Sequence, residues 1–240
     1  MTSEVRSSGR LAGSPDDRAI LDALGHVRDP ELDEPITDLG FVTDVKVGED
    51  AVRVRLRLPT YFCAPNFAYL MVADARAAVE SVPGAGRAEI VLEDHHDAER
   101  INAGVAAGRG FAATYGAEAG GELDALRLVF RRKAFLARQE RLARSLLDAG
   151  VATERLAAMR LGELGDSEQA RTYLERRAEL GLPVDPDAFL LVDPTGARVP
   201  ADRVVTSLRF AQTVRISIEG NASFCRGMLA TRYGLPGSTG

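Results

Sequence analysis

Hydrophobic and polar residues alternate most clearly between residues 51 and 58, where arginines separate the apolar positions Val52, Val54, Leu56 and Leu58. An apolar residue at every second position is typical of a β-strand with one buried and one solvent-facing side. Residues 87–93 alternate in the same way, and residues 41–47 also have the composition of a strand, which ends at the turn 48–50. The pattern therefore predicts three strands in this part of the chain.

Helical spacing predicts the elements before and between these strands. Ser14 and Pro15, followed by two aspartates, form a helix start, and the apolar stripe after them ends at Asp29-Pro30. Residues 66–81 form a second helical stretch that ends at a Pro-Gly pair. The order helix, strand, strand, helix, strand predicts an α+β fold in which helices pack on a short sheet. We assign this domain to residues 14–115.

A second region is predicted from residue 122 to residue 240. Residues 122–149 are helical, with apolar residues repeating at intervals of seven, and another helix begins near Ser167. The DPTG of residues 193–196 is a hairpin signal, and residues 214–219 alternate like a strand before a loop and a short helix. We therefore expect a helical linker and a mixed α/β region that serves client recognition or dimerisation.

Composition and charge exclude several classes of partner. Apolar residues make up 45% of the chain, charged residues 27%, and the formal net charge is -5, so nothing here predicts binding to nucleic acid or to an anionic membrane. Residues 1–13 are small and polar and lack an apolar signal core, which predicts a disordered lead-in and a cytoplasmic protein. The two cysteines lie far apart, as expected for reduced thiols.

Cys63 lies where the second predicted strand leads into the second predicted helix, in the stretch LPTYFCAPNFAYL. Unpaired N–H groups and the positive end of the helix dipole stabilise a thiolate there, and a thiolate binds soft metals or attacks electrophiles. The alternative is a buried apolar role, which is common for free cysteines. The stretch DPELDEPITDLGFV at residues 29–42 contains several acids. Their carboxylates either bind a metal or cap turns by accepting hydrogen bonds from backbone N–H groups.

Together these segments resemble the SufT- and PaaD-type family of small metal–sulfur cluster assembly factors. The resemblance rests on ordered motifs: DPEL at 29–32, DLGFV at 38–42, T-x-x-C at 60–63 and PGAG at 83–86. It covers about residues 16–112, including the ERINAGVAAGRGF after the last strand. The chain departs from the family pattern in one place, because the usual Cys-Pro is Cys63-Ala64-Pro65 here. The inserted alanine shifts the thiol relative to the start of the helix.

The resemblance implies an accessory factor, and not an enzyme, that builds or delivers iron–sulfur clusters or iron for a client metalloenzyme. Multicomponent di-iron oxygenases are among the clients that it implies. The matching functional residues are Asp29, Glu31, Thr60 and Cys63. A thiolate with two carboxylates is a mixed soft and hard ligand set, compatible with iron or zinc. Such a set binds weakly, which suits transient transfer better than a permanent structural site.

Two further positions are candidates for the same site. His95 and His96 follow the last predicted strand, and an imidazole is a common metal ligand. At most one of them faces a given site, because the side chains of neighbours in an extended chain point opposite ways. The alternative to a ligand role is that both lie in a polar loop. Cys225, like Cys63, follows a strand-like run and a short loop. This likeness is either a degenerate echo of the first site or a coincidence, and we favour coincidence. If both thiols converge, within one chain or across a homodimer, the metal site is stronger. Its neighbours would then be Asn221, Ser223 and Arg226.

Two other classes of function remain open. A cysteine-dependent hydrolase or acyl transferase needs a base beside Cys63, and none of the three histidines lies in a known motif. A structural adaptor would dock a partner on the helix with the seven-residue repeat and leave both cysteines inert. The sequence has no Gly-rich phosphate loop, no Cys-x-x-Cys and no H-E-x-x-H, so nucleotide hydrolysis, zinc-finger and zincin functions are excluded.

Overall fold

The computed structural model of the protein describes residues 16–119 and 123–234. The predicted lead-in at residues 1–13 lies outside this range. The chain packs as two compact units. Among the described residues, the first unit comprises residues 16–30, 34–119, 123 and 225–234, and the second comprises Glu31–Asp33 and Asp124–Phe224.

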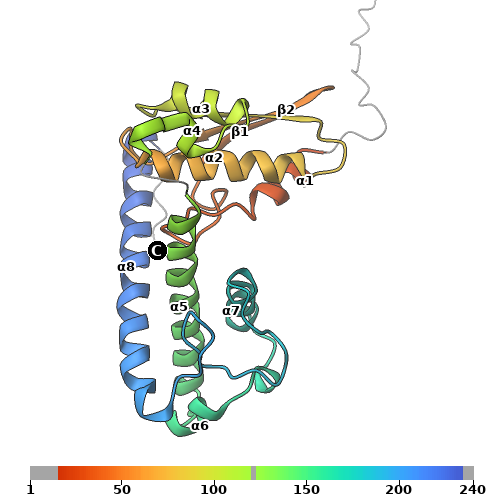
Figure 1. Cartoon of the computed structure of the whole chain (residues 1–240). Helices are drawn as coiled ribbons and strands as arrows, with labels where there is room; N and C mark the ends of the chain where they lie inside the picture. Colours follow the sequence, from red (N-terminus) through yellow and green to blue (C-terminus); the bar gives the residue numbers. More distant parts are fainter. Residues whose placement is uncertain (1–15, 120–122, 235–240) are drawn as a thin grey trace, which may run out of the picture. The chain divides into compact units, whose positions relative to one another are not determined.

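A three-stranded sheet lies in the first unit, with its strands in the order β1-β2-β3. The strands are β1 (Val42–Val47), β2 (Ala51–Arg57) and β3 (Arg87–Glu93). β1 pairs antiparallel with β2, and β2 pairs in parallel with β3. Figure 1 labels two of these strands, β1 and β2. Val52, Val54 and Leu56 are at most 1% exposed, so the three predicted strands and the buried side of β2 are confirmed.

Helices cover this sheet in the α+β arrangement that the sequence predicts. They are α1 (Asp17–Leu24), α2 (Pro65–Glu80), α3 (Ala98–Ala106) and α4 (Phe111–Tyr115), followed by a 3-10 turn at Gly116–Glu118. α2 connects the parallel strands β2 and β3, and α2 and α3 both contact β3. The N-cap of α1 is Asp16, whose carboxylate accepts a hydrogen bond from the Ala19 N–H at 2.7 Å. Ser14 and Pro15, the predicted helix start, lie outside the described range.

The turn before β3 requires a glycine. Gly86 has a φ of +67°, and a Cβ at this position would lie 2.8 Å from the carbonyl oxygen of Asp50. The Arg87 N–H donates to the same carbonyl at 3.2 Å. Two backbone segments therefore approach too closely for a side chain, which is the physical reason for the second glycine of PGAG.

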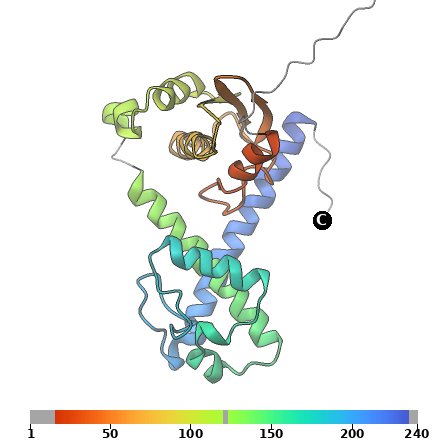
Figure 2. The ribbon, with the colours of Figure 1, turned by 90° about the vertical axis from the view of Figure 1, so that its right-hand side faces the viewer.

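The second unit is helical in its described part. Its helices are α5 (Asp124–Asp148), α6 (Thr153–Ala158), α7 (Glu168–Glu179) and α8 (Val204–Tyr233), with 3-10 turns at Leu161–Glu163 and Ala201–Arg203. α8 contributes its residues up to Phe224 to this unit. α7 packs against α5 (Figure 2), and in the core Phe135 and Tyr173, both 0% exposed, stack with ring centroids 5.6 Å apart. The two helices predicted before residue 182 are confirmed.

The predicted strand at residues 214–219 is wrong, because these residues lie inside α8, a helix of 30 residues. The loop and short helix expected around Cys225 belong to the same helix. The hairpin signal at residues 193–196 does form a turn, flanked by an isolated bridge between Val192 and Arg198. The described part of the second unit therefore contains isolated bridges but no strand. No helix within the described ranges combines the length and the apolar character needed to cross a membrane.

The last part of α8, residues 225–234, completes the first unit. Leu229 is 4% exposed, and its Cδ2 lies 3.5 Å from the place that a Cβ on Gly40 would take. Arg232 donates a hydrogen bond to the Asp94 carbonyl at 2.9 Å. The first unit is thus assembled from segments that are far apart in the sequence.

Candidate functional site

Cys63 lies directly before the N-cap of α2, as the sequence predicts. β2 ends at Arg57, and α2 begins at Pro65 with Ala64 as its N-cap. The inserted alanine therefore occupies the cap, and the thiol stands one residue before it. The Cys63 side chain is half-buried and forms no disulfide. Pro65 suits the first turn because its missing N–H would have no partner within the helix.

Thr60 is the residue whose side chain meets the thiol. Its Oγ1 lies 3.3 Å from the Cys63 Sγ, and the Cys63 N–H approaches the Thr60 carbonyl oxygen at 3.5 Å. A hydroxyl can donate a hydrogen bond to sulfur or accept one from it. The T-x-x-C spacing therefore closes a turn that brings the two predicted residues together.

His95 holds this turn from the end of β3. Its side chain is buried, and its Nε2–H donates to the Cys63 carbonyl oxygen at 2.7 Å. The Asp97 N–H donates to His95 Nδ1 at 3.1 Å, which requires the neutral tautomer with its proton on Nε2. Loss of hydration on burial lowers the pKa of His95, and the hydrogen bond to Cys63 partly opposes this shift. Both ring nitrogens thus bond backbone groups, and His95 supports the cysteine loop.

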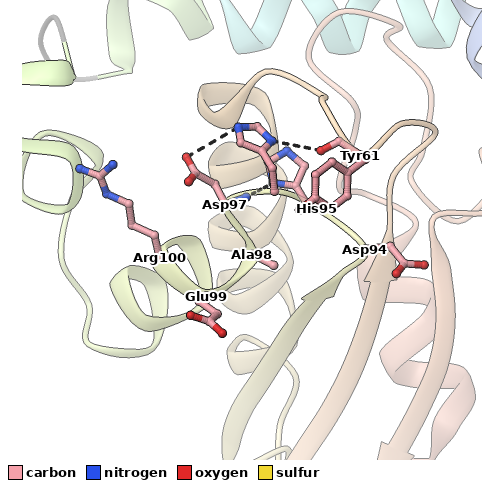
Figure 3. Close-up of a pocket in the computed structure, with 8 residues that line it drawn as sticks. Tyr61, Asp94, His95, Asp97, Ala98, Glu99 and Arg100 are labelled. Carbon is pink, nitrogen blue, oxygen red and sulfur yellow. Dashed lines mark hydrogen bonds and ion pairs between the residues drawn. The ribbon is translucent and has the colours of Figure 1, made fainter.

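His96 binds the same loop from a more exposed position. Its Nδ1 lies 3.0 Å from the Tyr61 carbonyl oxygen, and its backbone N–H donates to that oxygen at 3.1 Å. Its Nε2 lies 4.0 Å from Asp97 Oδ2. A pocket opens here, and Figure 3 shows Tyr61 and Asp97 along it. Its lining also includes Asp94, Ala98, Glu99 and Arg100.

Two exposed aromatic residues directly precede Cys63 in the loop. Phe62 is 77% exposed and Tyr61 is 46% exposed, and their rings meet edge to face at 5.0 Å. The Phe62 ring also lies 5.9 Å from the ring of His96. A large apolar side chain at such exposure beside a functional candidate is typical of a surface that contacts another molecule.

The predicted acids fall in different units. Asp29 belongs to the first unit, where it is buried and its N–H donates to the Glu34 carbonyl at 3.0 Å. Glu31 belongs to the second unit, where its Oε1 accepts a hydrogen bond from the Asn221 amide at 3.1 Å. Within the described ranges, no three or more His, Cys, Asp and Glu side chains are arranged to hold a metal ion. The ligand set therefore stays a prediction.

Cys225 stands inside α8 and not at a junction between a strand and a helix. Its side chain is half-buried, seven residues after the buried Ile218 and four before the buried Leu229. The expected neighbours Asn221, Ser223 and Arg226 lie on the same helix. The local likeness to the Cys63 stretch is therefore a coincidence of sequence.

The support of the loop by His95 is not among the predicted roles, since the sequence predicts His95 as a candidate ligand. The sequence also assigns no role to Tyr61, Phe62 or Asp97. One signal was present: the pair His95-His96 follows a strand whose parallel partner ends just before the cysteine loop. The ends of paired parallel strands lie together, so residues after them are neighbours.

Comparisons with known proteins agree with the motifs. A family model described as "Iron-sulfur cluster assembly protein" matches residues 17–91. The chain is also 32% identical over 84 residues to an uncharacterized protein of Methanocaldococcus jannaschii, and this stretch is 35% of the chain and 86% of that protein. No solved structure matches the chain. The matched segment runs from α1 into β3, and it contains the acidic stretch and Cys63 but ends before His95.

Proposed function

Since the chain belongs, through residues 17–91, to the family of iron–sulfur cluster assembly proteins, we propose that Cys63 is the point at which iron or an iron–sulfur cluster is held as cargo. The cargo then passes to a client metalloenzyme. A general role in cluster assembly follows from the family, and such a role implies contact with client proteins. The residue roles and the identity of the client are the finer part of the proposal.

The observation that carries the proposal is the meeting of Thr60 and Cys63 at the start of α2. The thiol is half-buried, it lies near the positive end of a 16-residue helix, and a hydroxyl stands 3.3 Å from its sulfur. The helix dipole favours a negative charge at this end, and the thiolate is the form of cysteine that binds metal. His95 keeps the loop in place through the Cys63 carbonyl.

One thiolate leaves most coordination positions of iron open. We assign Asp29, which lies in the same unit as Cys63, as a further, harder ligand, and the donor or the client supplies the others during transfer. Open coordination of this kind favours passage of the cargo over permanent retention, because four thiolates would bind far more tightly. Zinc is compatible with the same ligands.

The exposed rings of Tyr61 and Phe62 are the surface that we assign to the client. They directly precede Cys63 on the loop itself, so a client that covers them also covers the cargo. Aromatic side chains are favoured anchors in protein interfaces. We propose an oxygenase component with an iron centre as the client class.

The test compares wild type with Cys63→Ser and with the matched control Cys225→Ser, all purified and reconstituted without oxygen. Iron and sulfide per chain are measured first, and then transfer to the apo form of a [2Fe–2S] acceptor protein is followed by its absorbance. We expect Cys63→Ser to lose cargo and transfer while Cys225→Ser keeps both. Equal cargo and equal transfer in all three proteins would overturn the proposal.

The hydrolase alternative requires a base at the sulfur. In the described part of the chain the side chain that meets the Cys63 Sγ is Thr60, and His95 engages both ring nitrogens with backbone groups. This geometry favours a ligand over a nucleophile. The adaptor alternative, with an inert Cys63, is the outcome in which Cys63→Ser activates a client as well as wild type does.

A further inference from the structure

α8 is apolar on two opposite sides in the part that belongs to the second unit, residues 204–224. One side is buried, with Val204, Ala211 and Ile218 at most 7% exposed. The other side carries four large apolar side chains that solvent reaches: Val205 at 50%, Phe210 at 63%, Ile216 at 54% and Phe224 at 65% exposure. With 3.6 residues per turn, these four lie within about 140° of the helix surface, opposite the buried side. A helix that is apolar all round is usually covered on both sides.

The exposed side of α8 is almost free of charge. Among the exposed residues between positions 205 and 224, all of which the structure describes, only Arg209 is charged. The remaining exposed residues of this stretch are small: Thr206, Thr213, Ser217, Gly220 and Ser223. A surface that combines aromatic rings with few charges is typical of the core of a protein interface.

The order of large and small residues on this side fits a second copy of the same helix laid antiparallel to the first. With the two-fold axis level with residue 215, the facing pairs are Phe210 with Gly220, Phe224 with Thr206 and Thr213 with Ser217. Each phenylalanine ring thus meets a small residue of the second copy. A two-fold interface needs this kind of match, because the same patch serves on both copies.

Charge does not oppose this pairing. In the same register Arg209 faces the neutral amide Asn221 of the second copy. The other two charged residues of the stretch, Arg215 and Glu219, form ion pairs with residues of α5 in their own chain. Like charges therefore do not meet across the contact.

The patch is large enough for a reversible dimer. A buried phenylalanine covers roughly 150–250 Å², so two rings that are 63% and 65% exposed offer roughly 200–300 Å² per chain. Both copies contribute this area, and each ring covers a similar area of the facing helix, so the contact buries roughly 800–1,200 Å² in total. This total lies at the low end of specific interfaces, which corresponds to a dimer that dissociates on dilution.

We propose that the exposed side of α8 between Val205 and Phe224 is the interface of a homodimer, in which two copies of the chain pair this helix antiparallel. The contact residues all belong to the second unit. The dimer therefore carries two Cys63 loops, one on each first unit. This proposal does not rest on the function proposed for Cys63, so Cys63→Ser should dimerise as wild type does.

Sedimentation velocity of the whole chain between about 1 and about 100 μM tests the dimer. We expect wild type to dimerise over this range, and Phe210→Glu to raise the dissociation constant by about thirtyfold or more, as loss of a central aromatic anchor does. Val184→Glu is the matched control, because Val184 is 49% exposed in the same unit but lies outside α8. It should dimerise as wild type does.

Phe210 is mostly exposed, so Phe210→Glu should keep the fold, which far-UV circular dichroism checks; Phe210→Ala serves if it does not. A wild type that stays monomeric up to about 100 μM would overturn the proposal. A Phe210 variant that dimerises as well as wild type, or a Val184→Glu that loses the dimer equally, would overturn it too.

Disulfide cross-linking tests the antiparallel register, in a chain that also carries Cys63→Ser and Cys225→Ser. Thr213→Cys and Ser217→Cys are prepared as separate proteins and oxidised alone and as an equal mixture, and the joined peptides are identified by mass spectrometry. We expect the link between positions 213 and 217 in the mixture to exceed the link of either variant with itself. Links of each variant with itself, without an excess of the mixed link, would indicate parallel helices and overturn this register.

Discussion

Removal of the His95 side chain tests whether this residue supports the cysteine loop. In His95→Ala the Cys63 carbonyl and the Asp97 N–H lose their bonds of 2.7 and 3.1 Å. The imidazole is 5% exposed, and its removal leaves two part-buried polar groups without this partner. A buried group left in this way costs about 1–3 kcal/mol, so two would cost about 2–6 kcal/mol. Because water reaches part-buried groups, we expect the free energy of unfolding of the first unit to fall by about 2–4 kcal/mol.

His96→Ala is the matched control, one residue further along the chain. Its side chain is 34% exposed, and its backbone N–H keeps the 3.1 Å bond to the Tyr61 carbonyl. Only one side-chain hydrogen bond is lost, which is worth about 0.5–1.5 kcal/mol. The His96 variant should therefore be clearly the more stable of the two.

The assay is urea denaturation followed by far-UV circular dichroism, with hydrogen exchange of residues 58–64 measured in parallel. The m-value of each variant must match wild type for the midpoints to report stability. Exchange in the cysteine loop should be faster in His95→Ala than in His96→Ala. A loss of stability in His96→Ala as large as that in His95→Ala would refute the assignment of His95 as the support of the loop.

Two further predictions concern pH and the second unit. Burial lowers the pKa of His95 in the folded protein below its ordinary 6.5. As pH falls, the imidazole is therefore protonated in the unfolded chain before it is protonated in the folded one. The stability that His95 contributes is complete above about pH 6.5 and is lost as pH falls toward the lowered pKa. The difference in urea midpoint between wild type and His95→Ala should narrow from pH 7.5 to pH 5.5; a constant difference would contradict the burial argument. Arg177 is 1% exposed and donates to the carbonyls of Pro183 and Phe189 at 2.8 and 3.0 Å. Arg177→Leu should therefore lower the free energy of unfolding, measured by thermal melting, by about 3 kcal/mol or more. The exposed control Arg171→Leu should cost at most about 1 kcal/mol, and equal losses would argue against the buried contacts.

Local pattern was enough to predict the sheet, because β2 and β3 each bury every second residue. The buried residues of β2 are those at every second position, and β3 spans the predicted residues 87–93. The place of Cys63 followed in the same way, since the end of β2 and Pro65 both mark the junction locally. These features depend on residues that are close together in sequence.

The error at α8 shows where short patterns fail. Val214, Ile216 and Ile218 alternate and are β-branched, which favours a strand over six residues. The helical stripe emerges only over a longer range, where the buried residues Val204, Ala211 and Ile218 recur at intervals of seven. Ile216 is 54% exposed, so packing and not local preference decides the element.

Long-range contacts could not be predicted from the sequence for a related reason. His95 reaches the Cys63 carbonyl across 32 residues, and Arg138 reaches Asp33 across 105. No local pattern encodes a contact of that span. In the sequence Asp33 is one acid among several, and only the fold shows that Arg138 binds Asp33 while Asn221 binds Glu31.

The division of the first unit between distant segments has a consequence for its biosynthesis. Leu229 and Arg232 are added only after residues 124–224 have been synthesised, which takes roughly 5–20 seconds at about 5–20 residues per second. During that interval the nascent sheet and its helices lack the segment that closes over Gly40. The first unit therefore closes only after the second unit has been synthesised, and a chain truncated within α8 would have an unfinished cysteine-bearing unit.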